Sequence, residues 1–435
     1  MLNLPPIKPT LIKDVEDKSL SLSERVIYWT IVLTPVWWLA GIQPLFYPSV
    51  VTGLLAIHFR LNRLIEKPFL AFVWAWLAMS IVMLWTAFLG LNDMEANVLQ
   101  ILAAVLTFFK SYFLIFACLA LPFYNQVRPQ VVTRAIAWMA SSYLVTITVQ
   151  FAMLAIKIGG TGFLPPLARL IPGDKGSLRV DFATPSSFLG LPIPRTVLYT
   201  PDPPILGMCA LLCFLICLHE SNPRLKQLAL FGSFSALIVS ASRSALILLP
   251  LALLLSICFQ SKFSQQASLW LASLSLLCCS VLGLTINELL EKPSDFFNTA
   301  RSNAADSTLE RALVVKKTLE AWQESPWIGW GVIQGSVNLY EDTRITLGSF
   351  STYAAVLYLH GIFGAAALIT AMVLTLWHTY RLASQGYKAC NLAFAGLVTL
   401  YIALNATPLS WMAVNLWFFF VWLGAVLYVS EEDLI

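Results

Sequence analysis

Long apolar runs separated by short polar segments dominate the chain. About twelve of these runs are long enough, or nearly so, to cross the roughly 30 Å hydrocarbon core of a membrane as helices. They lie near Val26 to Leu39, Ile42 to Phe59, Phe69 to Leu89, Val98 to Leu121, Val131 to Ile158, Ile205 to His219, Leu225 to Ala241, Ser244 to Phe259, Leu269 to Leu289, Tyr353 to Trp377, Leu392 to Leu404 and Trp411 to Val429. The first two runs are short and meet at the break Gly41 to Pro44, so eleven spans with a re-entrant start remain an alternative. The pattern predicts an all-α, polytopic integral membrane protein with about twelve transmembrane helices and a large helical external (periplasmic) loop.

Composition supports the same class of protein. Of the 435 residues, 58% are hydrophobic and 11% are charged, which is far from the composition of soluble globular domains. The formal net charge of +4 is spread along the chain and forms no basic patch of the kind that binds nucleic acid. We therefore exclude nucleic-acid-binding proteins.

The positions of Lys and Arg predict the orientation in the membrane. With the N-terminus inside, the basic short loops all fall on the cytoplasmic side, as the positive-inside rule requires. Two longer external segments also carry cations, which an anionic ligand at the outer face would explain. The chain then divides into a cytoplasmic tail (1–25), a first set of transmembrane helices (26–286) with an external loop (159–204), an external loop of the catalytic type (287–347) and C-terminal transmembrane helices (348–435).

The second external segment contains a helix with an apolar face. Ser307 and Glu310 have the spacing of a capping box, which predicts the start of the helix. The side chains expected on its apolar face, at helical spacing, are Ala312, Val315, Leu319 and Trp322. Arg311 borders this face, so the pattern predicts a helix docked on the protein or membrane surface with a cation beside the bilayer.

Three arginines are candidates for binding an anion. Arg243, in SASRSA, lies between two apolar runs at the external end of the membrane. Its side chain either snorkels to the interface or grips a phosphate with its planar fork, which Lys would do less well. Arg311, and Arg195 in the first external loop, are the other two candidates, and Arg243 and Arg311 together would clamp a diphosphate.

His360 and Lys110 are the ionisable residues of most interest within the apolar runs. His360 precedes Gly361 and Gly364, where we expect the helix to break, so its ring is expected either to reach an external cavity or to bond between helices. Lys110 lies about halfway along a predicted span and is a functional candidate for that reason.

The C-terminal half of the chain resembles the O-antigen ligase and polymerase family of bacterial envelope glycosyltransferases. The resemblance rests on SRS at Ser242 to Ser244, on ER at Glu310 and Arg311 followed by WQESPWIGWG, and on GSFSTYAAVLYLHGIFG from Gly348 to Gly364. It implies a multi-pass enzyme of the bacterial inner (plasma) membrane whose active face is external. Such an enzyme transfers a glycan from undecaprenyl diphosphate to an acceptor sugar hydroxyl, with no metal, nucleotide or other cofactor.

The resemblance also implies the partners and the site. The partners would be the undecaprenyl-diphosphate-linked glycan, an acceptor glycan or glycolipid, membrane lipids and envelope polysaccharide assembly proteins. Arg243 and Arg311 match the arginines that are held to bind the diphosphate. The family pattern commonly has a histidine where this chain has Phe350, and phenylalanine cannot accept a proton. His360, Glu310 and Asp306 are the alternative candidates for the catalytic base.

Two other classes of function stay open beside a polysaccharide ligase or polymerase. A transporter or flippase for a lipid-linked or anionic substrate would give Lys110 a role. A non-catalytic scaffold of an envelope assembly complex would bind the lipid diphosphate without turnover, which would explain the loss of the histidine.

Overall fold

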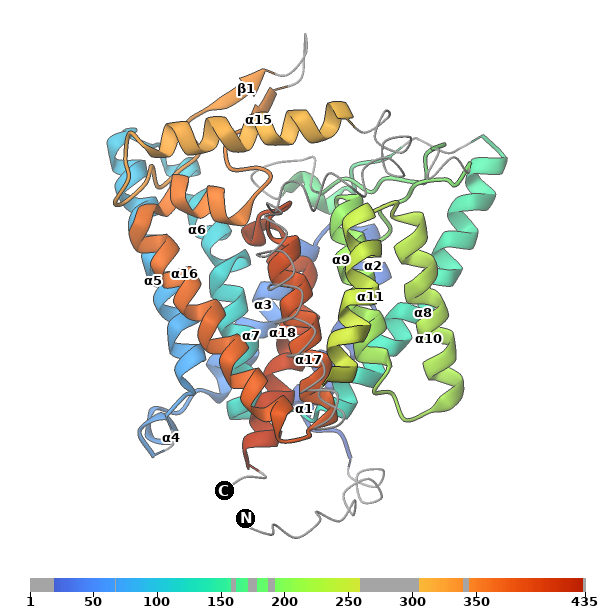
Figure 1. The fold of residues 1–435 in the computed structure, drawn as a ribbon. Helices are drawn as coiled ribbons and strands as arrows, with labels where there is room; N and C mark the ends of the chain where they lie inside the picture. The colour runs from blue at the N-terminus through green and yellow to red at the C-terminus, as the bar shows by residue number, and fades with distance from the viewer. Residues whose placement is uncertain are drawn as a thin grey trace, which may run out of the picture.

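The protein is a bundle of helices that stand roughly side by side, with one helix lying across one end (Figure 1). The computed structural model describes residues 19–66, 68–157, 162–170, 178–186, 192–258, 305–338 and 344–432. The helices are α1 (Leu22–Val32), α2 (Thr34–Ala40), α3 (Gln43–His58), α4 (Leu61–Glu66), α5 (Ala71–Asp93), α6 (Val98–Lys110), α7 (Tyr112–Asn125), α8 (Pro129–Ala155), α9 (Pro203–Cys217), α10 (Pro223–Val239), α11 (Arg243–Cys258), α15 (Ala305–Trp322), α16 (Thr352–Ser384), α17 (Lys388–Ala403) and α18 (Leu409–Glu432). A short 3-10 helix (Leu167–Leu170) and two strands, β1 (Ser336–Asn338) and β2 (Arg344–Thr346), are also described.

The predicted mostly helical membrane protein is confirmed. In the described part of the chain, five helices are long and apolar enough to cross a membrane: Ala71–Asp93, Val98–Asn125, Pro129–Ala155, Thr352–Ser384 and Leu409–Val429. Pro203–Cys217, Arg243–Ile257 and Lys388–Ala403 are shorter apolar helices. The predicted span from Leu269 to Leu289 lies outside the described residues, and the count of about twelve stays a prediction.

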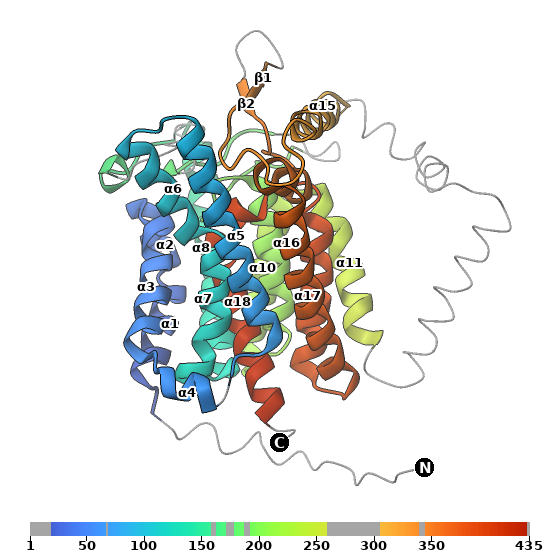
Figure 2. The same cartoon turned by 90° about the vertical axis from the view of Figure 1, so that its left-hand side faces the viewer.

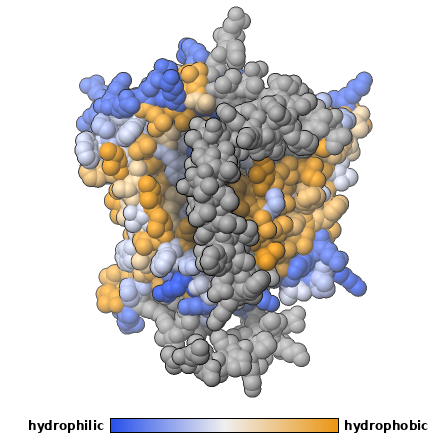
Figure 3. Space-filling view, viewed as in Figure 1, coloured by the Kyte–Doolittle hydropathy of each residue, from blue (hydrophilic) through white to orange (hydrophobic). Residues whose placement is uncertain are grey.

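The surface carries the apolar belt that a bilayer requires. Figure 3 shows hydrophobic side chains across the middle of one face and hydrophilic ones towards both ends. Many large apolar side chains are exposed, including Trp29, Ile81, Val145, Phe231, Ile247, Leu254, Ile369, Val373 and Trp377. Soluble monomers rarely expose apolar area on this scale, whereas a lipid environment covers it.

Two of the predicted spans are interrupted. The first apolar run is divided into α1 and α2, and α2 ends at Gly41, which has a positive φ of 69°. The run from Val98 is divided into α6 and α7 at Ser111, whose φ of −111° and ψ of −117° are not helical. Residues 22–25, expected in the N-terminal tail, form the first turn of α1.

The all-α prediction omits a β-hairpin. β1 and β2 pair antiparallel, with Ser336 opposite Thr346 and Val337 opposite Ile345. The hairpin projects from the same end of the bundle as α15 (Figure 2). Its strands have only three residues each, which is too short for their alternation to be recognised in the sequence.

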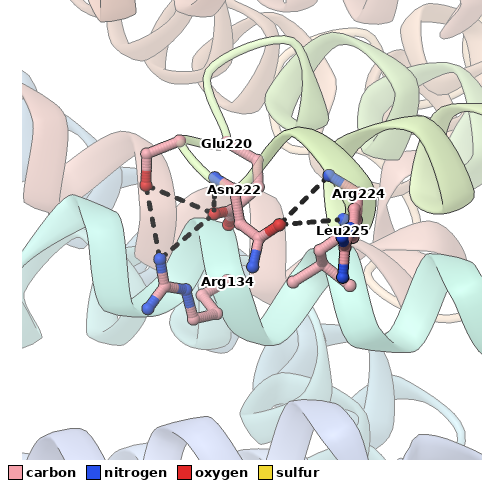
Figure 4. A network of polar contacts seen from close by, with 6 residues as sticks. Arg134, Glu220, Asn222, Arg224 and Leu225 are labelled. Atoms are coloured by element: carbon pink, nitrogen blue, oxygen red, sulfur yellow. Dashed lines mark hydrogen bonds and ion pairs between the residues drawn. The ribbon is translucent and has the colours of Figure 1, made fainter.

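Polar contacts fasten the loops at the opposite end, which we call the basic end because the short loops rich in Lys and Arg lie there. The Arg134 guanidinium of α8 bonds to the Glu220 carboxylate at 3.3 Å (Figure 4). Glu220 also accepts the N–H of Asn222 at 2.9 Å, and the Asn222 side chain accepts the N–H of Arg224 at the start of α10. The turn between α9 and α10 is thereby attached to α8.

The centre of the bundle is α18. Its residues from Val421 to Leu427 are buried on all sides, as is typical of a helix that is apolar all round. Its polar atoms find partners: the Trp422 indole N–H donates to the Thr133 hydroxyl of α8 at 3.0 Å. Helices α3, α6, α7, α8, α9, α16 and α17 pack against α18, and α15 packs against α16.

Candidate functional site

The candidate site lies at the α15 end of the bundle. α15 runs across the ends of the upright helices in Figure 1 and is seen nearly end-on in Figure 2. Arg311 and Glu310 come from α15, Arg195 comes from the loop before α9, Arg243 begins α11, and Phe350 precedes α16. Segments far apart in the sequence therefore meet at one end of the molecule.

α15 docks with a face that overlaps the predicted one, because Val315, Leu319 and Trp322 are half-buried. The helix begins at Ala305, so Ser307 lies inside it rather than at its N-cap. Val314 and Thr318 are the most buried residues of this face, and Ala312, expected on it, is exposed. Arg311 is half-buried and lies one turn before Val314 and Val315, so it shares the docked face instead of bordering it. A polar contact sets the docked face, because the Thr318 hydroxyl accepts the N–H of Gly348 at 3.0 Å.

Phe350 is the immediate partner of Arg311. The carbon at the centre of the guanidinium lies over the Phe350 ring, 5.3 Å from its centroid. A cation over an aromatic face is stabilised by about 0.5–1 kcal/mol at a partly exposed site. The residue that stands where the family pattern commonly has histidine therefore orients an arginine in this chain.

Arg195 and Asp202 share the electrostatic environment of Arg311. Burial lowers the pKa of Arg195, with the Arg311 charge adding to that effect and the Asp202 carboxylate opposing it. Burial raises the pKa of Asp202, and the positive charges of Arg195 and Arg311 lower it in part. We call these three residues the arginine cluster. The Arg195 Nε is buried and has no hydrogen-bond partner among the described residues, which is unusual for a guanidinium.

Asp202 occupies the N-cap of α9 but does not cap it. An aspartate there usually accepts backbone N–H groups of the first turn. The next two residues, Pro203 and Pro204, have no N–H, and the side chain makes no capping hydrogen bond. Its carboxylate is therefore available to the arginine cluster, a role that no sequence motif indicates.

Three sets of hydrogen bonds fix the backbone around Arg195. Arg195 and Thr184 exchange both backbone hydrogen bonds, each at 2.9 Å. The Thr196 hydroxyl donates to the side-chain oxygen of Gln150 on α8, and the Thr196 N–H donates to the carbonyl of Val239 at 3.1 Å. Because Val239 ends α10, the same contact links Arg195 to the turn that leads to Arg243.

Arg243 is the first residue of α11 and is exposed. Gly207 of α9 lies against Ser242, where any side chain on Gly207 would overlap the serine, so the starts of α9 and α11 approach closely. Within the described residues, neither a carboxylate nor either of the other two arginines contacts Arg243. The structure thus places Arg243 at the same end as the arginine cluster without joining it to the cluster.

His360 lies at a break in α16, as the glycine pattern predicts. Gly361 has φ 62° and ψ −160°, which interrupts the helix. His360 is buried, and its Nδ1 is 2.6 Å from the Thr86 hydroxyl of α5. His360 therefore bonds between α16 and α5, as one expectation had it, and it also lines a cavity. No contact among the described residues brings His360 to the arginine cluster.

The SPWIGWG run, from Ser325 to Gly331, closes the break in α16. The N–H groups of Ile362 and Phe363 donate to the carbonyls of Pro326 and Trp327, at 2.9 and 3.3 Å. The N–H groups of Trp330 and Gly331 donate to the carbonyls of Tyr358 and Leu359, at 2.9 and 2.7 Å. These helical groups would otherwise lack partners, so the Pro326–Gly331 loop satisfies the backbone that the kink releases.

The remaining candidates are placed as follows. Glu310 is half-buried, next to Arg311 in the sequence. Lys110 is the last residue of α6, directly before the break at Ser111. The side chain of Asp306 lies outside the part of the chain whose side chains are described. Within the described residues, no group of three or more His, Cys, Asp or Glu is arranged to hold a metal ion.

Comparison with known families identifies the part of the chain that carries most of this site. Residues 228–369 match the family model described as O-Antigen ligase. Over these residues the chain is similar to the O-antigen ligase family. The O-antigen ligase match includes Arg243, Arg311, Phe350 and His360, whereas Arg195 and Asp202 precede it. A search of curated proteins gave no match.

Proposed function

We propose that the protein is a membrane glycosyltransferase that moves a glycan from undecaprenyl diphosphate to an acceptor hydroxyl in bacterial surface polysaccharide synthesis. The α15 end would face the outside of the inner membrane. The observation that carries this proposal is the arginine cluster, where two guanidinium groups converge and one of them has a buried Nε without a partner. An anionic ligand would complete that hydrogen bonding and neutralise the like charges.

The arginine cluster fits the leaving group of the transfer. The acceptor oxygen attacks the anomeric carbon, and the bond from that carbon to the diphosphate oxygen breaks. The electron pair of the broken bond goes to the diphosphate, where Arg311 and Arg195 stabilise the charge that develops. Phe350 keeps the Arg311 guanidinium oriented towards the site. Arg243, from the same end of the bundle, is proposed to bind the outer oxygens of the diphosphate.

Asp202 is the proposed acceptor of the hydroxyl proton. Its carboxylate makes no capping bond, it shares the environment of both arginines, and its pKa is raised towards the range of a useful base. His360 and Glu310 were the candidates from sequence. His360 bonds to Thr86 directly before the α16 break, and we propose a positioning role for it. Glu310 stays a second candidate base.

Loss of surface polysaccharide tests the proposed function in cells. We expect Arg195→Ala and Arg243→Ala each to abolish the polysaccharide while the amount of protein in the membrane stays unchanged. An immunoblot of the polysaccharide and of the protein measures both quantities. Normal polysaccharide in both variants would overturn the assignment of these arginines and, with it, the proposed function.

Asp202→Asn is expected to separate binding from transfer. Because its pKa is raised, the Asp202 carboxylate takes up a proton at a pH above 3.8, the ordinary pKa. An incoming anion is then repelled less, so it should bind more tightly as the pH falls into that range. Removing the charge at pH 7 should tighten binding of inorganic pyrophosphate about fivefold, from roughly 1 kcal/mol less repulsion. The same variant should slow glycan transfer about 100-fold or more, because the proton acceptor is lost.

Calorimetry with pyrophosphate and a rate assay with the same preparation measure the two effects of Asp202→Asn. Asp181→Asn is the matched control, because Asp181 pairs with Arg179 at 2.8 Å and has no contact with the arginine cluster. Unchanged transfer with tighter binding would contradict the role of Asp202 as base and leave its electrostatic role in place.

A further inference from the structure

A cavity of about 330 Å³ lies between α5, α6, α16 and the start of α18. We call it the α6 cavity. It is lined by Met83, Ala87, Leu91, Met94, Ala96, Gln100, Ala103, Ala104, Thr107, Tyr112, Gly331, Val332, Ile333, Ala355, Val356, Leu359, His360, Ser410 and Trp411. Its volume lies in the range of about 300–1,000 Å³ that is typical of sites for small ligands.

One wall of the α6 cavity is the inner face of α6, which carries the small side chains of Ala103 and Ala104. Gln100, Ala103, Ala104 and Thr107 have the spacing of one helical face, and all four line the cavity. The side chain of Gln100 is held in the cap of α6, where it accepts the N–H of Asn97. α6 has no fully buried residue, and its other face exposes Val98, Leu99 and Leu102. α6 therefore separates a hollow from the lipid-facing surface instead of packing tightly.

The lining shows which chemistry the α6 cavity accepts. None of its lining residues is Lys, Arg, Asp or Glu, so it offers nothing to balance the charge of an ionic ligand. Apolar residues at the rim, Met94, Ile333 and Trp411, are 45%, 43% and 51% exposed, whereas Tyr112 and His360 at its base are buried. An uncharged, apolar occupant that enters from the α15 end fits this arrangement.

A chain of contacts connects the α6 cavity to the arginine cluster. Ser410 and Trp411 of its wall follow Leu409, whose N–H donates to the Thr352 hydroxyl at 2.7 Å. The same hydroxyl donates to the carbonyl of Thr407 at 2.7 Å. Thr352 begins α16 and stands next but one to Phe350, the ring under Arg311. The wall of the α6 cavity and the Phe350–Arg311 pair are thus both attached to the start of α16.

We propose that the α6 cavity holds the part of the polyprenyl chain that adjoins the diphosphate of the donor, with Ala103 and Ala104 setting the width of the site. The inference rests on the proposed function, because that function supplies a substrate with a hydrocarbon chain attached to a diphosphate. The cavity volume suits a segment of such a chain and is too small for a whole one. The rest of the chain then lies in the membrane beside the exposed face of α6.

Photolabelling of the purified full-length protein tests this inference without depending on turnover. The probe is undecaprenyl phosphate with a photoreactive diazirine in an isoprene unit close to the phosphate, and mass spectrometry locates the labelled residues. We expect labels on Ala103, Ala104 or Thr107, displaced by unlabelled undecaprenyl phosphate and not by the same concentration of phosphatidylglycerol. Labels confined to Val98, Leu99 and Leu102, or equal displacement by phosphatidylglycerol, would overturn the inference.

Substitution on the two faces of α6 supplies the matched comparison. Ala104→Phe fills the α6 cavity and should reduce labelling at least tenfold, whereas Leu102→Phe adds bulk on the exposed face and should leave labelling unchanged. Thermal unfolding of both variants checks that they are folded. Unchanged labelling of the inner face in folded Ala104→Phe would contradict the proposed occupant. Wild-type protein that transfers glycan but takes no label would reject the α6 cavity alone, while label without transfer would reject the proposed function alone.

Discussion

Arg311→Ala is expected to reduce the rate of glycan transfer by about 100-fold or more, the loss typical when a fixed donor to developing charge is removed. The guanidinium is half-buried on the docked face of α15, lies over the Phe350 ring and shares its field with Arg195 and Asp202. Truncation removes the positive charge that the leaving diphosphate requires. It also leaves Arg195 and Arg243 to bind that group without it.

Two variants make the result for Arg311→Ala specific. Arg311→Lys keeps the charge but loses the planar fork and the stacking on Phe350, so we expect an intermediate rate. Lys316→Ala removes a cation from the exposed face of the same helix and should leave the rate unchanged. The measurement is the initial rate of transfer in detergent with each purified variant. Equal losses in Lys316→Ala and Arg311→Ala would indicate that only the overall charge of α15 matters.

Gly361→Ala is expected to lower the free energy of unfolding by roughly 3 kcal/mol or more. The φ of 62° and ψ of −160° fall in a region that is essentially restricted to glycine, at a cost of about 1–3 kcal/mol for other residues. An added methyl group would also overlap the carbonyl of Trp327. Relief of that overlap would separate the Pro326–Gly331 loop from α16 and break the hydrogen bonds that close the kink.

Gly53→Ala is the matched control for Gly361→Ala. Gly53 lies inside α3 and has no atom within 4 Å of the place a methyl group would occupy. Alanine is favoured over glycine in a helix by about 1 kcal/mol, so this variant should be as stable as the wild type or more so. Thermal unfolding of the two variants in the same detergent measures the difference. Equal stability would mean that the kink does not need glycine.

The elements of the fold could largely be predicted from sequence, because apolar runs at membrane length and glycine or proline breaks act locally. The helix α15, its Arg311 and the break at Gly361 follow from such patterns. The interruption at Ser111 could not be predicted, since Lys110 and Ser111 interrupt an otherwise continuous apolar run without a glycine or proline.

The candidate site was predictable only in part, because its decisive contacts join distant segments. The docked face of α15 is set by a bond from Gly348 to Thr318, which no helical periodicity contains, so Ala312 was wrongly placed on it. The part played by Asp202 depends on charges from Arg195 and from α15. The two prolines after Asp202 were the available signal, because they release its carboxylate from capping.

The most direct test of the central claim is product formation by the purified wild-type protein. Undecaprenyl-diphosphate oligosaccharide and a panel of acceptor glycans are incubated with the protein, and mass spectrometry follows the acceptor and the released undecaprenyl diphosphate together. We expect the two products to appear in equal amounts with the wild type and Phe350→His, and neither to appear at a comparable rate with Arg311→Ala. Binding of the donor by the wild type with no product from any acceptor would contradict the claim that this protein is a glycosyltransferase.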